Sequence, residues 1–169
     1  MNRRRIAIMA TVAGMTIALA FAGIAKPSAR IAYNRTTSMP LGLYRLEPFV
    51  QPQRGMLVMT RLPADAATIA AQRRYLPASV PALKRVAAMT GSIVCRHGLR
   101  VTIDGQDAVR ALDRDRMGRG LPVWQGCRQL RQGQVFLLSG TDPAAFDGRY
   151  FGPVSTALII AEARALWTW

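Results

Sequence analysis

One stretch indicates the fold class of this sequence most directly, Val101-Thr102-Ile103-Asp104-Gly105-Gln106-Asp107-Ala108-Val109. It places Asp-Gly between two apolar arms. Asp-Gly favours the two-residue turn of a β-hairpin, because both residues of that turn need a positive φ, which Gly and Asp tolerate. We therefore predict two paired strands here and a domain that is rich in β-structure.

Short apolar or β-branched stretches bounded by Gly, Pro or Asp recur on both sides of the hairpin, as is typical of strands. They span residues 43–46, 56–60, 85–88, 92–95, 99–103 and 134–138. One alanine-rich segment, 64–75, has Asp65 near its start and is predicted to form a short helix. Residues 48–55 and 113–120 are polar and are predicted to be connections. The predicted fold class is mainly β, with one short helix.

The N-terminus has the layout of a signal peptide or a membrane anchor. Arginines at positions 3–5 precede an uncharged apolar run over residues 6–25, and Lys26 follows. A run of about 20 residues is long enough to span a bilayer as a helix. The small residues at 20 and 22 also fit the spacing that a leader peptidase accepts. Both interpretations stay open, and in both the positive N-terminus stays inside the cytoplasm.

The chain is expected to divide into this signal or membrane helix, residues 1–26, and one exported domain, residues 27–169. A chain of 169 residues leaves no room for a second large domain, and half of its residues are hydrophobic, which is enough to build one core. Everything from Lys26 onward is expected on the outer side of the inner membrane, in the periplasm.

The chain is strongly basic, with 23 Lys and Arg against 9 Asp and Glu and a formal net charge of +14. The arginines are spread along the whole chain, and no basic helix, aromatic RNA-binding signature or zinc-finger spacing organises them, so we expect no nucleic-acid partner. Only Lys26 and Lys84 are lysines. Lysine can lose its proton when apolar neighbours desolvate it, whereas arginine cannot. Lys84 lies in the apolar segment 80–88, although the local sequence also fits an exposed lysine beside Arg85.

Two cysteines, Cys95 and Cys127, accompany the single histidine, His97. They are too few for a structural zinc site, and no feature of the sequence calls for a metal, a nucleotide or an organic cofactor. If the domain is exported, the simplest prediction is one disulfide, which closes a loop of roughly thirty residues and contributes about 3 to 4 kcal/mol to stability. In the cytosol they would be free thiols. A redox pair is disfavoured, because catalytic dithiols usually form Cys-x-x-Cys.

Three further stretches carry residues that bear on chemistry. The first is Thr36-Thr37-Ser38-Met39-Pro40-Leu41-Gly42-Leu43-Tyr44, the second is the segment 82–91 around Lys84, and the third runs from Gly140 to Phe146-Asp147-Gly148-Arg149-Tyr150-Phe151-Gly152-Pro153. In this order they resemble the bacterial signal peptidase family, peptidase S26, and within it the TraF-type branch of conjugative pilin-maturation peptidases. The resemblance covers nearly the whole exported chain and implies a signal-peptidase-like, β-rich catalytic domain.

The resemblance implies a serine endopeptidase with Ser38 as nucleophile and Lys84 as general base. The residue types agree with this chemistry, because a serine hydroxyl needs a neighbour to remove its proton, and a lysine can do so only if burial lowers its pKa. The backbone N–H of Ser38 and the hydroxyl of Thr36 match the donors that stabilise the oxyanion in this family. Thr36 fits equally well as a turn residue bonded to its own backbone. Asp147 and Arg149 match residues that support the lysine site.

The sequence departs from the family pattern at two positions. Ala145 stands where the family commonly has a serine that orients the lysine, and Gly148 replaces a second serine. Ser139, Thr141 or a water molecule are the candidates to take over the first role. The two departures also motivate a different hypothesis, in which the chain is an inactive peptidase-fold component of a conjugation or type IV secretion apparatus.

The function that the resemblance implies is processing of an exported precursor after a small residue, with conjugative pilin as the expected substrate. The acyl-enzyme on Ser38 permits two outcomes, hydrolysis by water or closure of the pilin into a ring by its own amine, and both stay open. The implied partners are the precursor, the inner membrane and the conjugation machinery.

Overall fold

The computed structural model of the protein describes residues 4, 8–16, 30–140 and 142–169. Residues 8–16 are helical. Within the described ranges, no helix is both long enough and apolar enough to cross a membrane. Most of the apolar run predicted over residues 6–25, and the domain boundary predicted at residue 26, lie outside the described residues, so the division of the chain into 1–26 and 27–169 stays a prediction.

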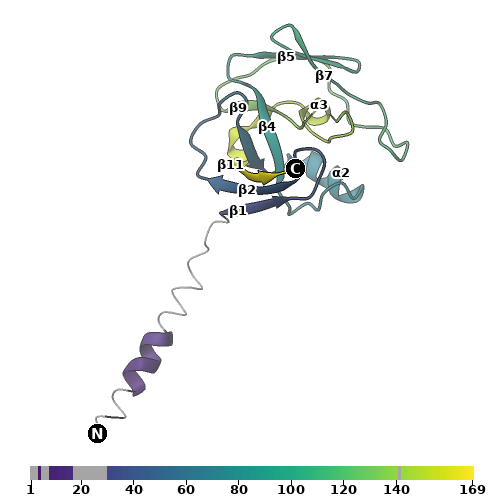
Figure 1. Ribbon diagram of the computed structural model, residues 1–169. Coiled ribbons are helices and arrows are strands. Elements are labelled where there is room, and N and C mark those ends of the chain that lie inside the picture. The colour runs from purple at the N-terminus through teal and green to yellow at the C-terminus, as the bar shows by residue number, and fades with distance from the viewer. Residues whose placement is uncertain (1–3, 5–7, 17–29, 141) are drawn as a thin grey trace.

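The predicted hairpin is confirmed. Strands β6 (Arg100–Ile103) and β7 (Gln106–Arg110) pair antiparallel, and the turn between them consists of Asp104 and Gly105, with φ of 51° and 81°. The hairpin belongs to a small four-stranded sheet with the strand order β7-β6-β5-β8. Its other members are β5 (Ile93–His97) and β8 (Gly126–Gln129). Figure 1 shows β5 and β7 together at one end of the folded body.

A larger sheet of seven strands forms the rest of the fold, and all its neighbouring strands run antiparallel. In spatial order its strands are β1 (Ile31–Asn34), β2 (Gly42–Glu47), β11 (Ile159–Thr168), β3 (Leu57–Thr60), β4 (Ala82–Met89), β9 (Gln134–Leu138) and β10 (Val154–Ser155). Figure 1 shows β1, β2 and β11 side by side at the end of the body opposite the small sheet. The chain's two catalytic candidates, in the loop after β1 and in β4, thus come from different parts of one sheet.

The mainly β prediction is confirmed, and each of the six predicted stretches corresponds to a strand: β2, β3, β4, β5, β6 and β9. The alanine-rich segment forms α2 (Ala64–Gln72). The structure adds a one-turn helix, α3 (Gly148–Phe151), and a 3₁₀ turn over Thr156–Leu158. It also adds four strands that the sequence patterns did not predict, β1, β8, β10 and the ten-residue β11, which pairs with β2 on one side and β3 on the other.

The register of β4 explains how a lysine enters the interior. Side chains of a strand alternate between two faces, so Lys84 and Val86 lie on the same face of β4. Val86 is fully buried in an apolar cluster, and Lys84 is only 4% exposed. Lys84 faces Val58 of β3 across the sheet, another fully buried residue. Lys84 is therefore buried, and the alternative prediction of an exposed lysine is wrong.

The predicted disulfide is present. Cys95 of β5 and Cys127 of β8 are directly opposite each other in the small sheet, and their sulfur atoms are bonded. The bond joins two residues that are 32 positions apart. His97 Nε2 lies 3.9 Å from the sulfur of Cys127. Because both sulfurs are held in the disulfide, they are not thiolates, which is the form that ligates a metal ion.

Candidate active site

Ser38 lies in the loop between β1 and β2, and Asn34 at the end of β1 holds this loop in shape. The Asn34 amide nitrogen donates to the carbonyl oxygens of Thr36, Met39 and Pro40, at 2.9, 3.0 and 2.9 Å. Its amide oxygen accepts from the backbone N–H of Thr36 at 3.2 Å. Asn34 was not among the residues predicted from the sequence to shape the site. The available signal was an Asn ahead of a polar turn, where its side chain commonly bonds the backbone two residues on.

The hydroxyl of Ser38 is in contact with Thr36. The two side-chain oxygens are 3.1 Å apart, and the Thr36 hydroxyl also donates to the amide oxygen of Asn34 at 3.0 Å. Because a hydroxyl has a single proton, Ser38 is the donor toward Thr36 in this arrangement. Thr36 is therefore both a turn residue and a neighbour of the Ser38 oxygen. To donate to a developing oxyanion, the Thr36 hydroxyl must first turn away from Asn34.

Lys84 is almost completely buried, and its ammonium nitrogen donates to the hydroxyl of Ser139 at 2.7 Å. Burial lowers the pKa of Lys84 from 10.5 to about 8, because desolvation disfavours the charged form. The negative charge of Asp147 opposes this and raises the pKa, whereas the positive charge of Arg149 adds to the lowering. With a pKa of about 8, roughly a tenth of the Lys84 side chains are neutral at pH 7, far more than an unperturbed lysine would provide.

Asp147 and Arg149 form a buried ion pair behind the lysine. Their side chains are 0% and 1% exposed. Arg149 donates Nε to Asp147 Oδ1 at 2.8 Å and Nη2 to Oδ2 at 3.0 Å, the two-bond geometry that suits a guanidinium and a carboxylate. The second carboxylate oxygen also accepts from the backbone N–H of Ser139 at 2.7 Å. The pair thus contacts Ser139, the residue that binds the lysine.

Ser38 and Lys84 open into one cleft of about 710 Å³. Among the residues that line it are Thr36, Ser38, Lys84 and Ala145, together with α2 residue Ala70. Its other lining residues are Leu62 and members of the segments 33–37, 75–83, 112–121 and 142–146. Within the described part of the chain, the side-chain hydrogen bonds of Ser38 and Lys84 go to Thr36 and Ser139 and not to each other. Both groups nevertheless face the same space.

The connection predicted over residues 113–120 is an ordered wall of this cleft. Asp115 accepts a hydrogen bond from the Tyr75 hydroxyl, just beyond α2. Arg116 forms an ion pair with Asp142 at 3.7 Å, which links the connection to the segment before α3. These contacts join three segments that are distant in sequence. The sequence predicts only a polar connection here, because nothing in its own residues identifies Tyr75 or Asp142 as partners.

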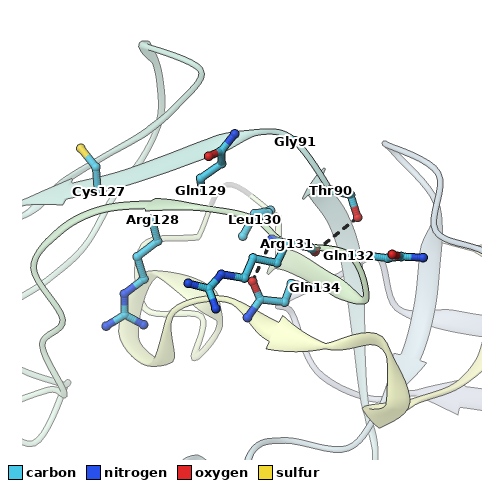
Figure 2. Close-up of a pocket in the computed structure, with 9 residues that line it drawn as sticks. All are labelled: Thr90, Gly91, Cys127, Arg128, Gln129, Leu130, Arg131, Gln132 and Gln134. Carbon is cyan, nitrogen blue, oxygen red and sulfur yellow. Dashed lines mark hydrogen bonds between the residues drawn. The ribbon is translucent and has the colours of Figure 1, made fainter.

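A second cavity, of about 790 Å³, lies along the small sheet and is lined by residues 90–91, 127–132 and 134 (Figure 2). Figure 2 shows Cys127 and Gln129 on one side of β8 and Arg128 on the other. The lining contains no serine and no lysine, so it offers no nucleophile with an adjacent base. Neither Cys95 nor Cys127 lines the cleft around Ser38, and the structure therefore keeps the disulfide apart from the candidate active site.

Most of the site residues predicted from the sequence lie in the cleft or directly behind it. Ser38, Thr36 and Lys84 line the cleft, and Asp147 and Arg149 lie behind it. Of the three candidates to replace the family's orienting serine, Ser139 contacts the lysine. Thr141 lies outside the described residues.

Comparison with known proteins identifies the family of this chain. A sequence profile described as Signal peptidase, peptidase S26, matches residues 3–169. The chain is 31% identical to a plasmid transfer protein TraF of Escherichia coli over 176 residues, which cover 98% of this chain and 97% of that protein. It is 33% identical to a conjugal transfer protein TraF of Agrobacterium fabrum, over 80% of this chain and 81% of that protein.

Among solved structures, a signal peptidase I of Enterococcus faecalis aligns with a TM-score of 0.40 and 16% sequence identity, over 68% of this chain and 97% of that one. The profile match over almost the whole chain and the TraF relatives assign the family. This chain belongs to the signal peptidase family, peptidase S26, as a relative of the TraF plasmid transfer proteins.

Proposed function

We propose that this protein is a serine endopeptidase that processes an exported precursor, with Ser38 as nucleophile and Lys84 as general base. One observation carries the proposal: a lysine that is 4% exposed, with a pKa lowered to about 8, opens into the same cleft as a loop serine. A buried amine that is partly neutral is the form of lysine that can accept a proton from a hydroxyl.

The reaction follows from these groups. Neutral Lys84 takes the proton of Ser38, and Ser38 Oγ forms a bond to the carbonyl carbon of the scissile peptide, whose electron pair moves onto the carbonyl oxygen. The backbone N–H of Ser38 and the Thr36 hydroxyl are the donors proposed for that oxyanion. Lys84 then gives the proton to the leaving nitrogen, the carbon–nitrogen bond breaks, and an acyl-Ser38 remains. Water or an amine of the substrate resolves it.

The proposed substrate is conjugative pilin. The relatives from Escherichia coli and Agrobacterium fabrum are plasmid and conjugal transfer proteins, which supports a role in plasmid transfer. A cleft beside a strand suits an extended peptide, and small side chains after which the chain is cut need only shallow pockets. Both resolutions of the acyl-enzyme, cleavage with water and ring closure, remain within the proposal.

We place the protein in the periplasm at the inner membrane. The charged and apolar layout of residues 3–26 supports this placement. A second support is an exposed aromatic cluster that joins the edge strand β1 to the C-terminal end of β11. The ring of Trp169 lies 6.3 Å from that of Tyr33 and 5.8 Å from that of Trp167. Trp and Tyr are enriched at membrane–water interfaces.

Processing of the pilin precursor in cells tests the proposed function. Strains carry wild type, Ser38→Ala, Lys84→Met or Ser92→Ala as the matched control, and immunoblots verify equal abundance. The precursor is expected to accumulate unprocessed with the first two variants and to mature with the control. Normal maturation with Ser38→Ala would instead support the hypothesis of an inactive component of the conjugation or secretion apparatus.

A further inference from the structure

Two consecutive residues after β9 each contact one member of the proposed catalytic pair. The Ser139 hydroxyl accepts from Lys84 Nζ at 2.7 Å, and the backbone N–H of Gly140 donates to the backbone oxygen of Ser38 at 2.7 Å. Because the two residues share a peptide bond, which is planar and stiff, their contacts fix where the lysine nitrogen lies relative to the serine loop.

We propose that Ser139 is the positioning residue of Lys84 and that its hydroxyl holds the amine so that the nitrogen lone pair points toward Ser38. The inference rests on the proposed function, since it concerns the orientation of the general base. A neutral amine has two N–H bonds and one lone pair, so fixing one N–H restricts the direction of the lone pair. A lysine side chain is otherwise flexible, with a long aliphatic stem.

The surroundings of Ser139 make it a fixed acceptor. Its side chain is 6% exposed, and its backbone N–H is bonded to Asp147. Asp147 is in turn held by two hydrogen bonds from the guanidinium of Arg149 and one from its backbone N–H, and Arg149 also donates to the carbonyl oxygen of Gly140 at 3.4 Å. The buried ion pair therefore positions the lysine through Ser139, whereas its two charges influence the pKa of Lys84 through space.

This arrangement also accounts for the two departures from the family pattern. A side chain at position 148 has no room, because a Cβ there would lie 2.6 Å from the carbonyl oxygen of Leu137 and 2.9 Å from the ring of Phe136. Both neighbours belong to β9, the strand that ends just before Ser139. Gly148 thus lets α3 pack directly against β9, where Asp147 reaches the Ser139 N–H. With the lysine held from β9, a serine at position 145 is not needed.

The chain offers a direct probe of this contact because it contains only two lysines. Full-length protein in detergent micelles is labelled with [13Cε]lysine, and Lys26→Arg leaves Lys84 as the single labelled residue. The resonance is titrated in this background with Ser139→Ala and with the control Ser92→Ala. Loss of the acceptor removes an interaction that favours the ammonium, so the pKa of Lys84 is expected to fall in the first variant only.

Kinetic measurements distinguish a loss of Lys84 orientation from a change in Lys84 protonation. At pH 9.5, where the amine is largely neutral in either protein, Ser139→Ala is expected to lower kcat for the purified pilin precursor roughly 10- to 100-fold, as misplacement of a catalytic group does. KM should stay nearly unchanged, since Ser139 is not among the described residues that line the cleft. A merely structural serine would alter neither kcat at this pH nor the lysine titration.

The isosteric pair Ser139→Thr and Ser139→Val provides a second comparison if the alanine variant is unfolded, because these variants differ chiefly in the hydroxyl. Thr is expected to retain kcat and Val to lose it. Equal kcat in the two, together with an unchanged Lys84 titration, would overturn the proposal. If wild type does not process the precursor, the proposed function fails, whereas the titration still decides whether Ser139 binds the lysine.

Discussion

Lys84 and Ser139 are 55 residues apart in sequence and form a buried hydrogen bond of 2.7 Å between a lysine nitrogen and a serine hydroxyl. The acceptor is uncharged, and the carboxylate of Asp147 bonds instead to the backbone of Ser139 and to Arg149. Among the residues that the structure describes, no carboxylate is therefore in hydrogen-bond contact with the buried lysine. This explains why desolvation outweighs the attraction of Asp147 and why the pKa of Lys84 falls to about 8.

Peptidase activity is expected to rise with pH up to about 8. The general base must be unprotonated, so kcat/KM should increase about tenfold per pH unit below the pKa of Lys84 and level off above it. Rates of precursor cleavage between pH 6 and 10 measure this profile. His97→Ala serves as the control and should not change it. A rise centred near 6.5, the region in which histidine ordinarily titrates, would contradict the assignment of Lys84 as the base.

Replacing Lys84 with Met is expected to abolish processing and to stabilise the fold. The difference between a pKa of 10.5 in an unfolded chain and about 8 in the fold corresponds to about 3 kcal/mol, part of which is lost because Ser139 loses its partner, so we expect a gain of about 1 to 3 kcal/mol at pH 7. Urea unfolding measures it. The exposed neighbour Arg85→Met is the control, with a change within about 0.5 kcal/mol.

The difference in stability between Lys84→Met and wild type is also expected to depend on pH. Between pH 8 and 10.5 the unfolded wild-type chain binds more protons at Lys84 than the folded chain does, so wild-type stability should increase with pH across this window. The advantage of Lys84→Met over wild type should shrink over the same interval. An advantage that stays constant from pH 7 to 10.5 would show that its origin is packing and not the buried charge.

Gly148→Ala is expected to destabilise the protein by about 1 to 3 kcal/mol, because the added Cβ overlaps the carbonyl oxygen of Leu137, a backbone atom that cannot rotate away. The thermal unfolding midpoint measures the loss. Gly120→Ala is the matched control, since nothing lies within 4 Å of a Cβ at that exposed position. Equal midpoints for the two variants would contradict the close packing of α3 on β9.

Removal of the disulfide is expected to reduce stability without removing the active site. Cys95→Ala combined with Cys127→Ala should cost about 3 to 4 kcal/mol in the free energy of unfolding, the value expected for a loop of this length. Processing of the precursor at low temperature should persist, because neither cysteine lines the cleft. Loss of processing in a variant that remains folded would show that the small sheet contributes to catalysis.

Local chemistry decides which parts of the fold could be predicted from sequence. The hairpin was predictable because Asp104 and Gly105 specify their own turn. Strand β11 was not predicted, because its segment 161–165 consists of Ala, Glu and Arg, residues with good helix propensity. Pairing with β2 and β3 overrides that preference. The alternation was nevertheless present, since Ala161 and Ala163 are buried and the residues between and after them are more exposed.

In the candidate site, too, some residues could be predicted from the sequence and others could not. The residue types at Ser38 and Lys84, together with the family resemblance, were enough to select the proposed pair. For the group that accepts the hydrogen bond of Lys84, the sequence left three candidates, because it does not reveal a contact between β4 and the end of β9. Asn34 and Asp115 were missed for a similar reason, since the roles of short polar residues in turns depend on which backbone groups the fold brings near them.

Ser139, just after β9, binds the lysine, whereas segment 142–146 supplies part of the cleft lining. Orientation of the lysine and the shape of this part of the cleft therefore depend on different residues. Under the proposed function, we expect side-chain substitutions in that segment to change which precursor fits while Lys84 keeps its hydrogen bond to Ser139. For the proposed peptidase, this separation would let the surface that recognises a changing substrate evolve while the residue that binds the lysine stays the same.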